Sequence, residues 1–557
     1  MKKHIKYLVS ISSLVFALSG CSNSFLDEKV LNSFAPESLN DKLGYEAAEV
    51  GLYNKFSTFY TTDNDQTYIG AWNLGTDILW APAGRSNGVA RPFFDYAQMT
   101  STDGGSSRVW SYLYGIINNA NILIANAEGT SSVGMTQQEK DAYNAEARFF
   151  RAYSYNMLAT LFGGTPLITQ PLSGAKTDFV RAPIADVNKT IEDDLLFAIA
   201  NLPDVDALAH KGRAHKAMAQ QLLAEVYLRI NKPDLAEKQC NDIINSGKFS
   251  LIKNRFGVKA GQPGDAFSDM FVSGNQRRKQ GNTEAIWVLE QENPVDKVGG
   301  STGNPQQRRN WVGAYYDLPG MLPIDSLGGR GIGRIRLDNW VLYGLYKGND
   351  MRNSKYSIHR QHYFNNPASK YSAVFGKKFP YSQDAVFTLA DGSTLKTFAS
   401  DTIFRNAPYI TKWNQFDSRD TFGYGMWKDF ILMRLGETYL LRAEARLKQS
   451  NFAGAADDIN ILRSRANAPA VTASDITLNF VLDERARELI GEENRRMTLV
   501  RTGTLVERAR RLNGTAKLAG GNIETTNGLQ DYNVLLPIPQ SEIDLNKDAK
   551  LDQNPGY

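Results

Sequence analysis

Two segments near the C-terminus constrain the fold most. Between Phe430 and Arg465, apolar side chains recur at three- and four-residue spacing, the pattern of amphipathic helices that each bury one face. Asn451 stands where a helix cap belongs, and only Lys448-Gln449-Ser450 separates the two halves of the pattern. A link this short brings two helices back antiparallel, so the sequence predicts a helical hairpin.

A third helix is expected within residues 482–503, and most of its surface is charged. The charged side chains include Arg485, Glu488, Glu492, Arg495 and Arg496. Opposite charges three or four residues apart pair across one helical turn and stabilise a helix by roughly 0.2–0.5 kcal/mol each. Charges paired in this way also neutralise one another. We therefore expect a structural role for them rather than acid or base catalysis.

The same region resembles the C-terminal signature of the SusD/RagB family. The matching stretches are residues 434–437, 441–445, 459–466, 484–489, 499–503 and 553–557, with N-terminal counterparts at 110–121 and 146–153. Thr498 departs from the pattern, which usually has an Asp there, so one ion pair of the family is not expected in this chain. The resemblance implies a mainly α, SusD-like fold, with tetratricopeptide-like helix pairs and long, partly β, loop insertions.

Residues 1–20 predict an export signal. Three lysines within the first six residues precede a short apolar stretch, 7–18, which is too short to span a bilayer stably. Leu18-Ser19-Gly20-Cys21 has the form of a bacterial lipobox, so we expect cleavage before Cys21 and acylation of that residue. Each buried CH₂ contributes roughly 0.8 kcal/mol, so several acyl chains hold a protein firmly. Residues 21–45 would then be a lipidated tether.

The resemblance divides the mature chain into two parts. Residues 46–330 correspond to the N-terminal half, with helix pairs and binding loops, and residues 331–557 to the C-terminal half. Helices are expected over residues 110–125 and 144–162, and as a pair over 214–247. Four alanines (Ala224, Ala236, Ala443 and Ala455) stand twelve residues apart in two pairs. Small residues at this spacing let paired helices approach closely, as in tetratricopeptide repeats.

Between the helices the sequence predicts loops with little regular structure. Residues 284–290 are expected to form a strand, and residues 375–398 a hairpin around Ala390-Asp391-Gly392. Cys240 lies within an expected helix and is interpreted as a small buried hydrophobe.

Several kinds of chemistry find no support in the sequence. A net charge of +4 over 557 residues, without a long basic run, gives no warrant for nucleic-acid binding. With five histidines in the chain, His359 and His362 have no third ligand pattern beside them and are interpreted as surface residues, so no metal site is predicted. Asp63 and Asp65 place carboxylate oxygens at alternate positions, so the sequence leaves open that a structural cation binds there weakly. The G-x-S-x-G matches at 84–88 and 299–303 lack the strand that a nucleophile elbow needs.

Aromatic side chains in the loops point to saccharide binding. A sugar ring packs its C–H face on a flat aromatic ring and directs its hydroxyls to amide or guanidinium groups. The candidate platforms are Trp72, Trp80, Trp311, Tyr315 and Tyr316, and the candidate hydrogen-bonding residues are Arg85, Asn87 and Asn310.

The resemblance implies a non-catalytic lipoprotein on the outer face of the outer membrane, with no cofactor. It would capture an oligosaccharide or similar nutrient and deliver it to a TonB-dependent, SusC-like transporter. The alternative is a surface tetratricopeptide scaffold that binds only protein. A glycoside hydrolase would need two carboxylates flanking a cleft, and the sequence nominates no such pair.

Overall fold

The computed structural model describes most of the chain from residue 41 onward. The described ranges are 41–61, 67–82, 88–129, 134–172, 174–208, 210–297, 305–324, 327–403, 405–414, 422, 425–513 and 527–557. The predicted signal, Cys21 and most of the predicted tether lie outside them. No helix in these ranges is both long enough and apolar enough to cross a membrane.

Helices dominate the described chain, which confirms the mainly α prediction. The longer ones are α2 (Lys42–Thr61), α4 (Gly104–Glu128), α5 (Gln137–Leu161), α6 (Ile184–Asn201), α7 (Lys216–Arg229), α8 (Pro233–Asn245), α12 (Leu435–Lys448), α13 (Phe452–Arg465) and α14 (Leu478–Leu489). The shorter ones are α3 (Thr67–Trp72), α9 (Ala266–Asp269), α10 (Gln307–Trp311), α11 (Asn339–Tyr343), α15 (Arg495–Arg501), α16 (Leu505–Leu512) and α17 (Gln540–Leu545).

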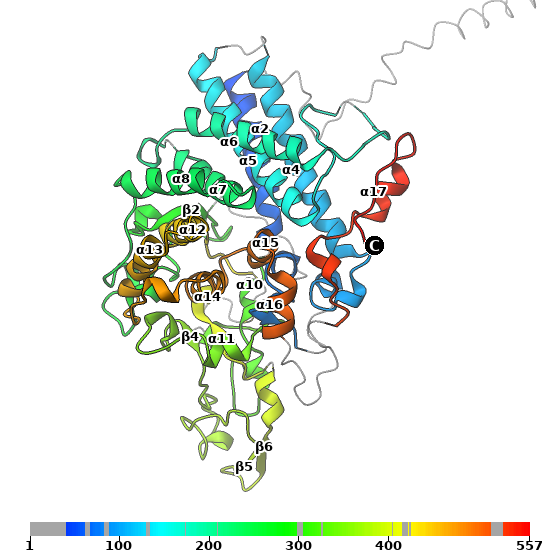
Figure 1. Cartoon of the computed structure of the whole chain (residues 1–557). Helices are drawn as coiled ribbons and strands as arrows, with labels where there is room; N and C mark the ends of the chain where they lie inside the picture. Colours follow the sequence, from blue (N-terminus) through cyan, green and yellow to red (C-terminus); the bar gives the residue numbers. More distant parts are fainter. Residues whose placement is uncertain are drawn as a thin grey trace, which may run out of the picture.

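The longer helices pack as a series of antiparallel neighbours. Helices α4 to α8 follow one another, and α12 then packs on α8 and is followed by α13 (Figure 1). The four alanines predicted at helix contacts are all completely buried. Since α8 and α12 come from opposite sides of residue 330, the two parts of the chain share one core.

The two hairpins that the sequence predicted turn in the same way. Asn231 between α7 and α8, and Ser450 between α12 and α13, have positive φ angles of 57° and 60°. Most residues other than glycine avoid this left-handed region, so each helix ends sharply there. Asn451 then caps α13, its side-chain oxygen accepting the Gly454 amide at 3.0 Å, as predicted.

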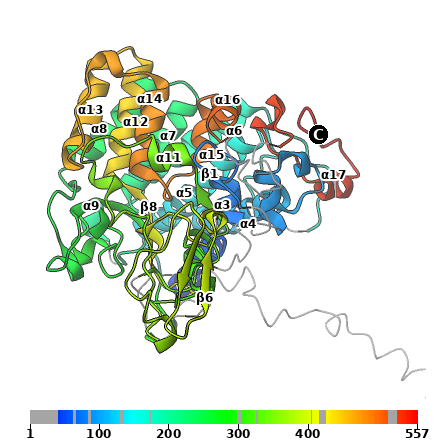
Figure 2. The same cartoon turned by 90° about the horizontal axis from the view of Figure 1, so that it is seen from below.

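The strands are short and pair antiparallel in twos. They are β1 (Leu79–Trp80) with β3 (Arg336–Leu337), β2 (Ala285–Leu289) with β8 (Phe430–Arg434), β4 (Ile358–His359) with β7 (Tyr409–Ile410), and β5 (Ala385–Thr388) with β6 (Thr394–Thr397). The predicted strand at 284–290 and the predicted hairpin are both confirmed, and the hairpin lies at one extremity of the molecule (Figures 1 and 2). The expected helical stripe was wrong at its start: residues 430–434 form a strand because they pair with β2.

Helix α14 turns its charged face into the protein. The completely buried carboxylate of Glu488 accepts hydrogen bonds from Arg434 at 2.6 Å and Arg352 at 3.0 Å, and it also contacts Arg465. Arg434 reaches Glu284, just before β2, at 2.7 Å. These side chains form one buried ionic network, the Glu488 network, which joins α13, α14 and β8 to the start of β2.

The ion pairs predicted within one helical turn are wrong, although the charges are neutralised as expected. Arg485 donates to Glu493 at 2.5 Å and not to Glu488. Arg495 binds Asp77, with nitrogen–oxygen distances of 2.7 and 2.8 Å. Spacing along one helix could not reveal such partners, because they lie on other elements or beyond the helix end.

Asp77 is the centre of a second buried ionic group. Arg508 also donates to its carboxylate, at 2.7 Å. Burial alone would raise the pKa of Asp77, but Arg495 and Arg508 outweigh that effect and lower the pKa below its usual value. Nearby, the Thr498 hydroxyl donates to the carboxylate of Glu493 at 2.7 Å, so an uncharged donor stands where the family pattern has an Asp.

The histidine prediction also needs correction. His362 is 1% exposed, and its Nδ1 lies 2.6 Å from the side-chain oxygen of Asn406. His359 is partly buried beside it, with ring centroids 4.6 Å apart. Neither is therefore an open surface residue. Cys240 is a buried free thiol, as predicted. Among the described residues, no group of three or more His, Cys, Asp or Glu side chains is placed to hold a metal ion.

Candidate ligand-binding face

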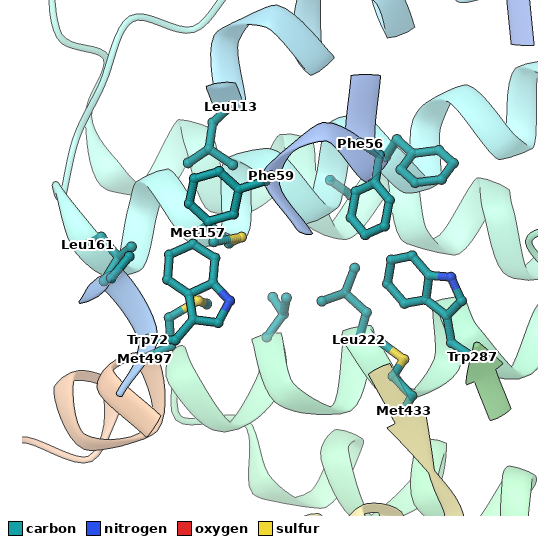
Figure 3. Close-up of a cluster of buried hydrophobic side chains, with 14 of the residues drawn as sticks. Phe56, Phe59, Trp72, Leu113, Met157, Leu161, Leu222, Trp287, Met433 and Met497 are labelled. Carbon is teal, nitrogen blue, oxygen red and sulfur yellow. The ribbon is translucent and has the colours of Figure 1, made fainter. Parts of the chain in front are cut away.

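Trp72 belongs to the core and not to an open loop. Its ring packs against Phe59, with centroids 5.1 Å apart, and only 2% of the residue is exposed. Figure 3 shows it pointing inward beside Met157 and Met497, opposite Trp287. This corrects the prediction that Trp72 offers a platform, because neither face of the ring is open to a ligand.

Trp80 is also buried, but against a charged side chain. It pairs with Arg336 across β1 and β3, and the guanidinium carbon lies 5.2 Å from the ring centroid. Two nitrogens of that guanidinium, Nε and Nη1, have no hydrogen-bond partner in the described part of the chain. The cation–π contact occupies the indole face that was predicted to receive a sugar. Trp80 is therefore removed from the set of platforms.

Asn310 and Trp311 lie in α10, every residue of which is buried. The Trp311 ring stacks on Trp413, with centroids 6.4 Å apart and planes inclined by 14°. Gly491 packs close to this pair, since a Cβ there would lie 2.9 Å from Nε1 of Trp413. The rings are thus enclosed between α10 and the turn after α14. This corrects the prediction that Asn310 and Trp311 face a ligand directly.

Tyr315 organises a loop from within. Its hydroxyl donates to the Gly329 carbonyl at 3.0 Å and accepts the Ile324 amide at 3.0 Å. The ring stacks on His362 at 5.3 Å, and the residue has no measurable exposure. The prediction that Tyr315 is a platform is corrected: it holds the loop from which its neighbour Tyr316 projects.

Tyr316 is the predicted platform that the structure leaves accessible. It is half-buried and meets Phe422 edge to face, with centroids 5.8 Å apart. Phe422 is 56% exposed, and Arg330 donates to its carbonyl oxygen at 3.2 Å. We refer to Tyr316, Phe422 and Arg330 as the aromatic face. It presents two rings and a guanidinium together, the groups that a saccharide ring and its hydroxyls require.

Sequence reasoning missed Phe422 and Arg330. Phe422 stands in the run Phe-Gly-Tyr-Gly at 422–425, and such an alternation of aromatic residues and glycine is a signal of an exposed aromatic loop. Arg330 has no local signal, because its role depends on a contact 92 residues away. Arg85 and Asn87 lie outside the described residues, so their predicted roles stay predictions.

A buried lysine fixes the turn that carries Trp413. The ammonium of Lys428 donates to the carbonyl oxygens of Lys412 at 2.6 Å and Asn414 at 2.8 Å. Burial lowers the pKa of Lys428 to about 7. Lys412 is buried too, and burial lowers its pKa to about 8, although Glu492 beside it opposes the shift. Both lysines thus have a structural role: Lys428 binds the backbone of the turn at 412–414, and Lys412 binds Glu492.

The fold therefore consists of packed pairs of helices, and the loops inserted between them carry the accessible rings of Tyr316 and Phe422. The SusD family matches residues 267–557, which is more than half of the chain. A second family, described as starch-binding and associating with the outer membrane, matches residues 26–228. The chain belongs to the SusD family.

Individual relatives match over three quarters of the chain or more. SusD-like protein P25 of Formosa agariphila is 26% identical over 563 residues, covering 97% of each chain. The starch-binding protein SusD of Bacteroides thetaiotaomicron is 27% identical over 472 residues, covering 76% of this chain and 74% of that protein.

Solved structures share the fold at lower identity. A laminarin binding SusD-like protein has a TM-score of 0.65 at 22% identity, covering 93% of this chain and 100% of that one. Surface glycan-binding protein A from Bacteroides thetaiotaomicron has a TM-score of 0.66 at 19% identity, covering 92% and 99%. The SusD-like prediction for the fold is thus confirmed.

Proposed function

We propose that this protein binds a glycan at the cell surface without catalysing a reaction on it. The observation that carries the proposal is the aromatic face, where Tyr316 and Phe422 remain accessible while the other predicted platforms in the described residues are buried. Family membership supports it, because one relative is named a starch-binding protein and one structure of similar fold holds laminarihexaose.

The absence of catalysis is part of this proposal. Two carboxylates of α14, those of Glu484 and Glu488, are completely buried and held by guanidinium groups. The arginines around Glu488 lower its pKa well below the usual range, against the opposing effect of burial. A carboxylate in that state is neither available to a substrate nor ready to donate a proton near neutral pH.

The proposed location and partner follow from the sequence and the family. Acylation at Cys21 would hold the protein on the outer surface of the outer membrane, and a SusC-like, TonB-dependent transporter would receive the glycan. The description of the family that matches residues 26–228, associating with the outer membrane, supports this location.

The test is calorimetric titration with laminarihexaose and maltoheptaose, on the wild type and three variants. Phe422→Ala and Tyr316→Ala each remove a ring from the aromatic face. Phe375→Ala is the matched control, since that ring is 52% exposed but lies outside the face. A lost stacking contact is worth about 0.5–1.5 kcal/mol plus the burial of its area. Affinity should therefore fall about tenfold in the first two variants.

Two results would contradict the proposal. Equal losses in all three variants would mean that the aromatic face has no special part in binding. Failure of a broad glycan panel to bind the wild type, together with capture of a purified protein partner, would favour the tetratricopeptide scaffold instead. Release of reducing sugar from a bound glycan would exclude a purely non-catalytic role.

A further inference from the structure

A groove that shares no lining residue with the aromatic face lies between α2, the loop that precedes α7, and strand β2, which is seen below α7 in Figure 1. Its outer section has a volume of about 530 Å³ and its inner section about 220 Å³. The two sections share Gly212, Arg213, Trp287, Val288 and Glu290 in their walls. They are therefore continuous, and together they offer the space of a small-ligand site.

The inner section is rich in positive charge. Its cationic side chains are Lys211, Arg213, Arg277, Arg278 and Lys279. Asp206 and Glu290 are the carboxylates among its lining residues, and further carboxylates behind the wall, Glu292, Asp429 and Glu49, pair with Arg277 and Arg213. An excess of one charge in a partly enclosed space focuses the electrostatic field and raises the local concentration of ions of the opposite sign.

Some of these cations are already committed to the structure. Arg277 binds Asp429 at 2.7 Å, and Arg213 contacts the buried Glu49. Lys211 and Lys279 are different: both are exposed, and neither forms an ion pair with another described residue. The Lys211 ammonium makes one long hydrogen bond, 3.5 Å, to the carbonyl oxygen of Asp206, a contact that an anion entering the groove can displace.

The inner wall includes a buried acceptor without a donor. His215 is 2% exposed, and its Nε2 lies 2.8 Å from the carbonyl oxygen of Ile286. A carbonyl only accepts, so Nε2 carries the proton and Nδ1 is left as an acceptor. Burial lowers the pKa of His215 to about 4, which keeps the ring neutral near pH 7. Nδ1 has no hydrogen-bond partner among the described residues, and a ligand hydroxyl is the kind of donor it lacks.

We propose that this groove is a second binding site, which takes an anionic saccharide. Lys211 and Lys279 bind the acidic group, and a hydroxyl of the same sugar ring satisfies Nδ1 of His215. The inner section holds the volume of about seven water molecules at roughly 30 Å³ each, which is the scale of one sugar ring. The outer section leaves room for the saccharide to continue along α2. The site is independent of the aromatic face.

The experiment compares sodium glucuronate with glucose, which lacks the carboxylate. Calorimetric titration at low and at physiological salt is run on the wild type, Lys211→Gln/Lys279→Gln and Lys377→Gln/Lys396→Gln. The last variant is the matched control, because it removes the same charge from exposed positions at the far loops. Glucuronate should bind at least tenfold more tightly than glucose, and the groove variant alone should lose that preference. Added salt should weaken glucuronate binding.

A second measurement uses the wild-type protein, so it does not depend on how the lysine substitutions affect folding. With only five histidines in the chain, selective ¹⁵N-histidine labelling resolves the individual rings. Glucuronate should shift the Nδ1 resonance of His215 and leave that of His362 in place. Equal affinity for glucose and glucuronate, no binding, or equal losses in the two lysine variants would each overturn the proposal. Loss of glucuronate binding in Phe422→Ala, with the groove variant unaffected, would assign the anion to the aromatic face instead.

Discussion

The Glu488 network allows a quantitative prediction for Glu488→Gln. The carboxylate is completely buried and contacts three guanidiniums, those of Arg434, Arg352 and Arg465. The amide keeps the volume of the side chain but removes the negative charge, which leaves buried positive charge uncompensated. Breaking a buried ion pair in this way costs roughly 3–5 kcal/mol.

That cost translates into a modest but measurable shift in melting temperature. At roughly 2.1 cal/mol/K for each of about 470 described residues, the unfolding entropy is near 1 kcal/mol/K, so the melting temperature should fall by about 3–5 °C. Scanning calorimetry and urea unfolding measure the change. Glu507→Gln is the matched control, because Glu507 pairs with Arg511 at the surface, where such a pair contributes little.

The outcome that would refute this reasoning is a melting temperature for Glu488→Gln within about 1 °C of both the wild type and the control. The buried charges would then be no more important than surface ones. Affinity for laminarihexaose provides a further check. The folded variant should bind with unchanged affinity, since the network is separate from the aromatic face, and a large loss of affinity at unchanged stability would assign Glu488 to the binding site.

Four other predictions follow from single residues. Burial and the neighbouring Glu146 raise the pKa of Glu49, so the folded protein holds a proton that the unfolded chain releases above about pH 4.3. The free energy of unfolding therefore falls as pH rises. In Glu49→Gln the urea midpoint should depend less on pH between about pH 5 and 9 than it does in the wild type. Gly491→Ala should destabilise by at least about 1–2 kcal/mol in urea titrations, because φ is +82° and the new Cβ meets a side-chain carbon at 2.4 Å; an unchanged midpoint would contradict the close packing. Asn451→Ala should cost about 1 kcal/mol by removing the α13 cap, whereas Asn451→Gly should cost only a few tenths. Cys21→Ala should release the protein from the membrane fraction, and persistence in that fraction after a carbonate wash would argue against a lipid anchor.

Helices and turns were predictable where local spacing decides the structure. The hairpin at 435–465, the break between α7 and α8, and the cap at Asn451 all depend on residues within one or two turns of each other. The hairpin β5–β6 was equally local, with Gly392 at a φ of 78° in its turn. The segment 430–434 broke this rule, because its strand depends on a partner that lies far away in the sequence.

The candidate site was less predictable, because exposure is a property of the assembled fold. Trp72 and Tyr316 are both aromatic residues next to polar loops, yet one is enclosed by the core and the other remains accessible. No local signal separates them, since the enclosing groups come from distant segments. The cationic groove was unpredictable for the same reason. Its walls come from α2, the loop before α7 and strand β2, and no spacing rule in the sequence connects these three segments.

The ionic group at Asp77 has a consequence for the order in which the chain folds. Arg495 and Arg508 stand 418 and 431 residues after the carboxylate that they neutralise. Until both have been synthesised, burying Asp77 would strand a charge in an apolar interior, which is strongly unfavourable. The segment between α3 and β1 that carries Asp77 therefore reaches its ionised, paired state only when α15 and α16 are in place.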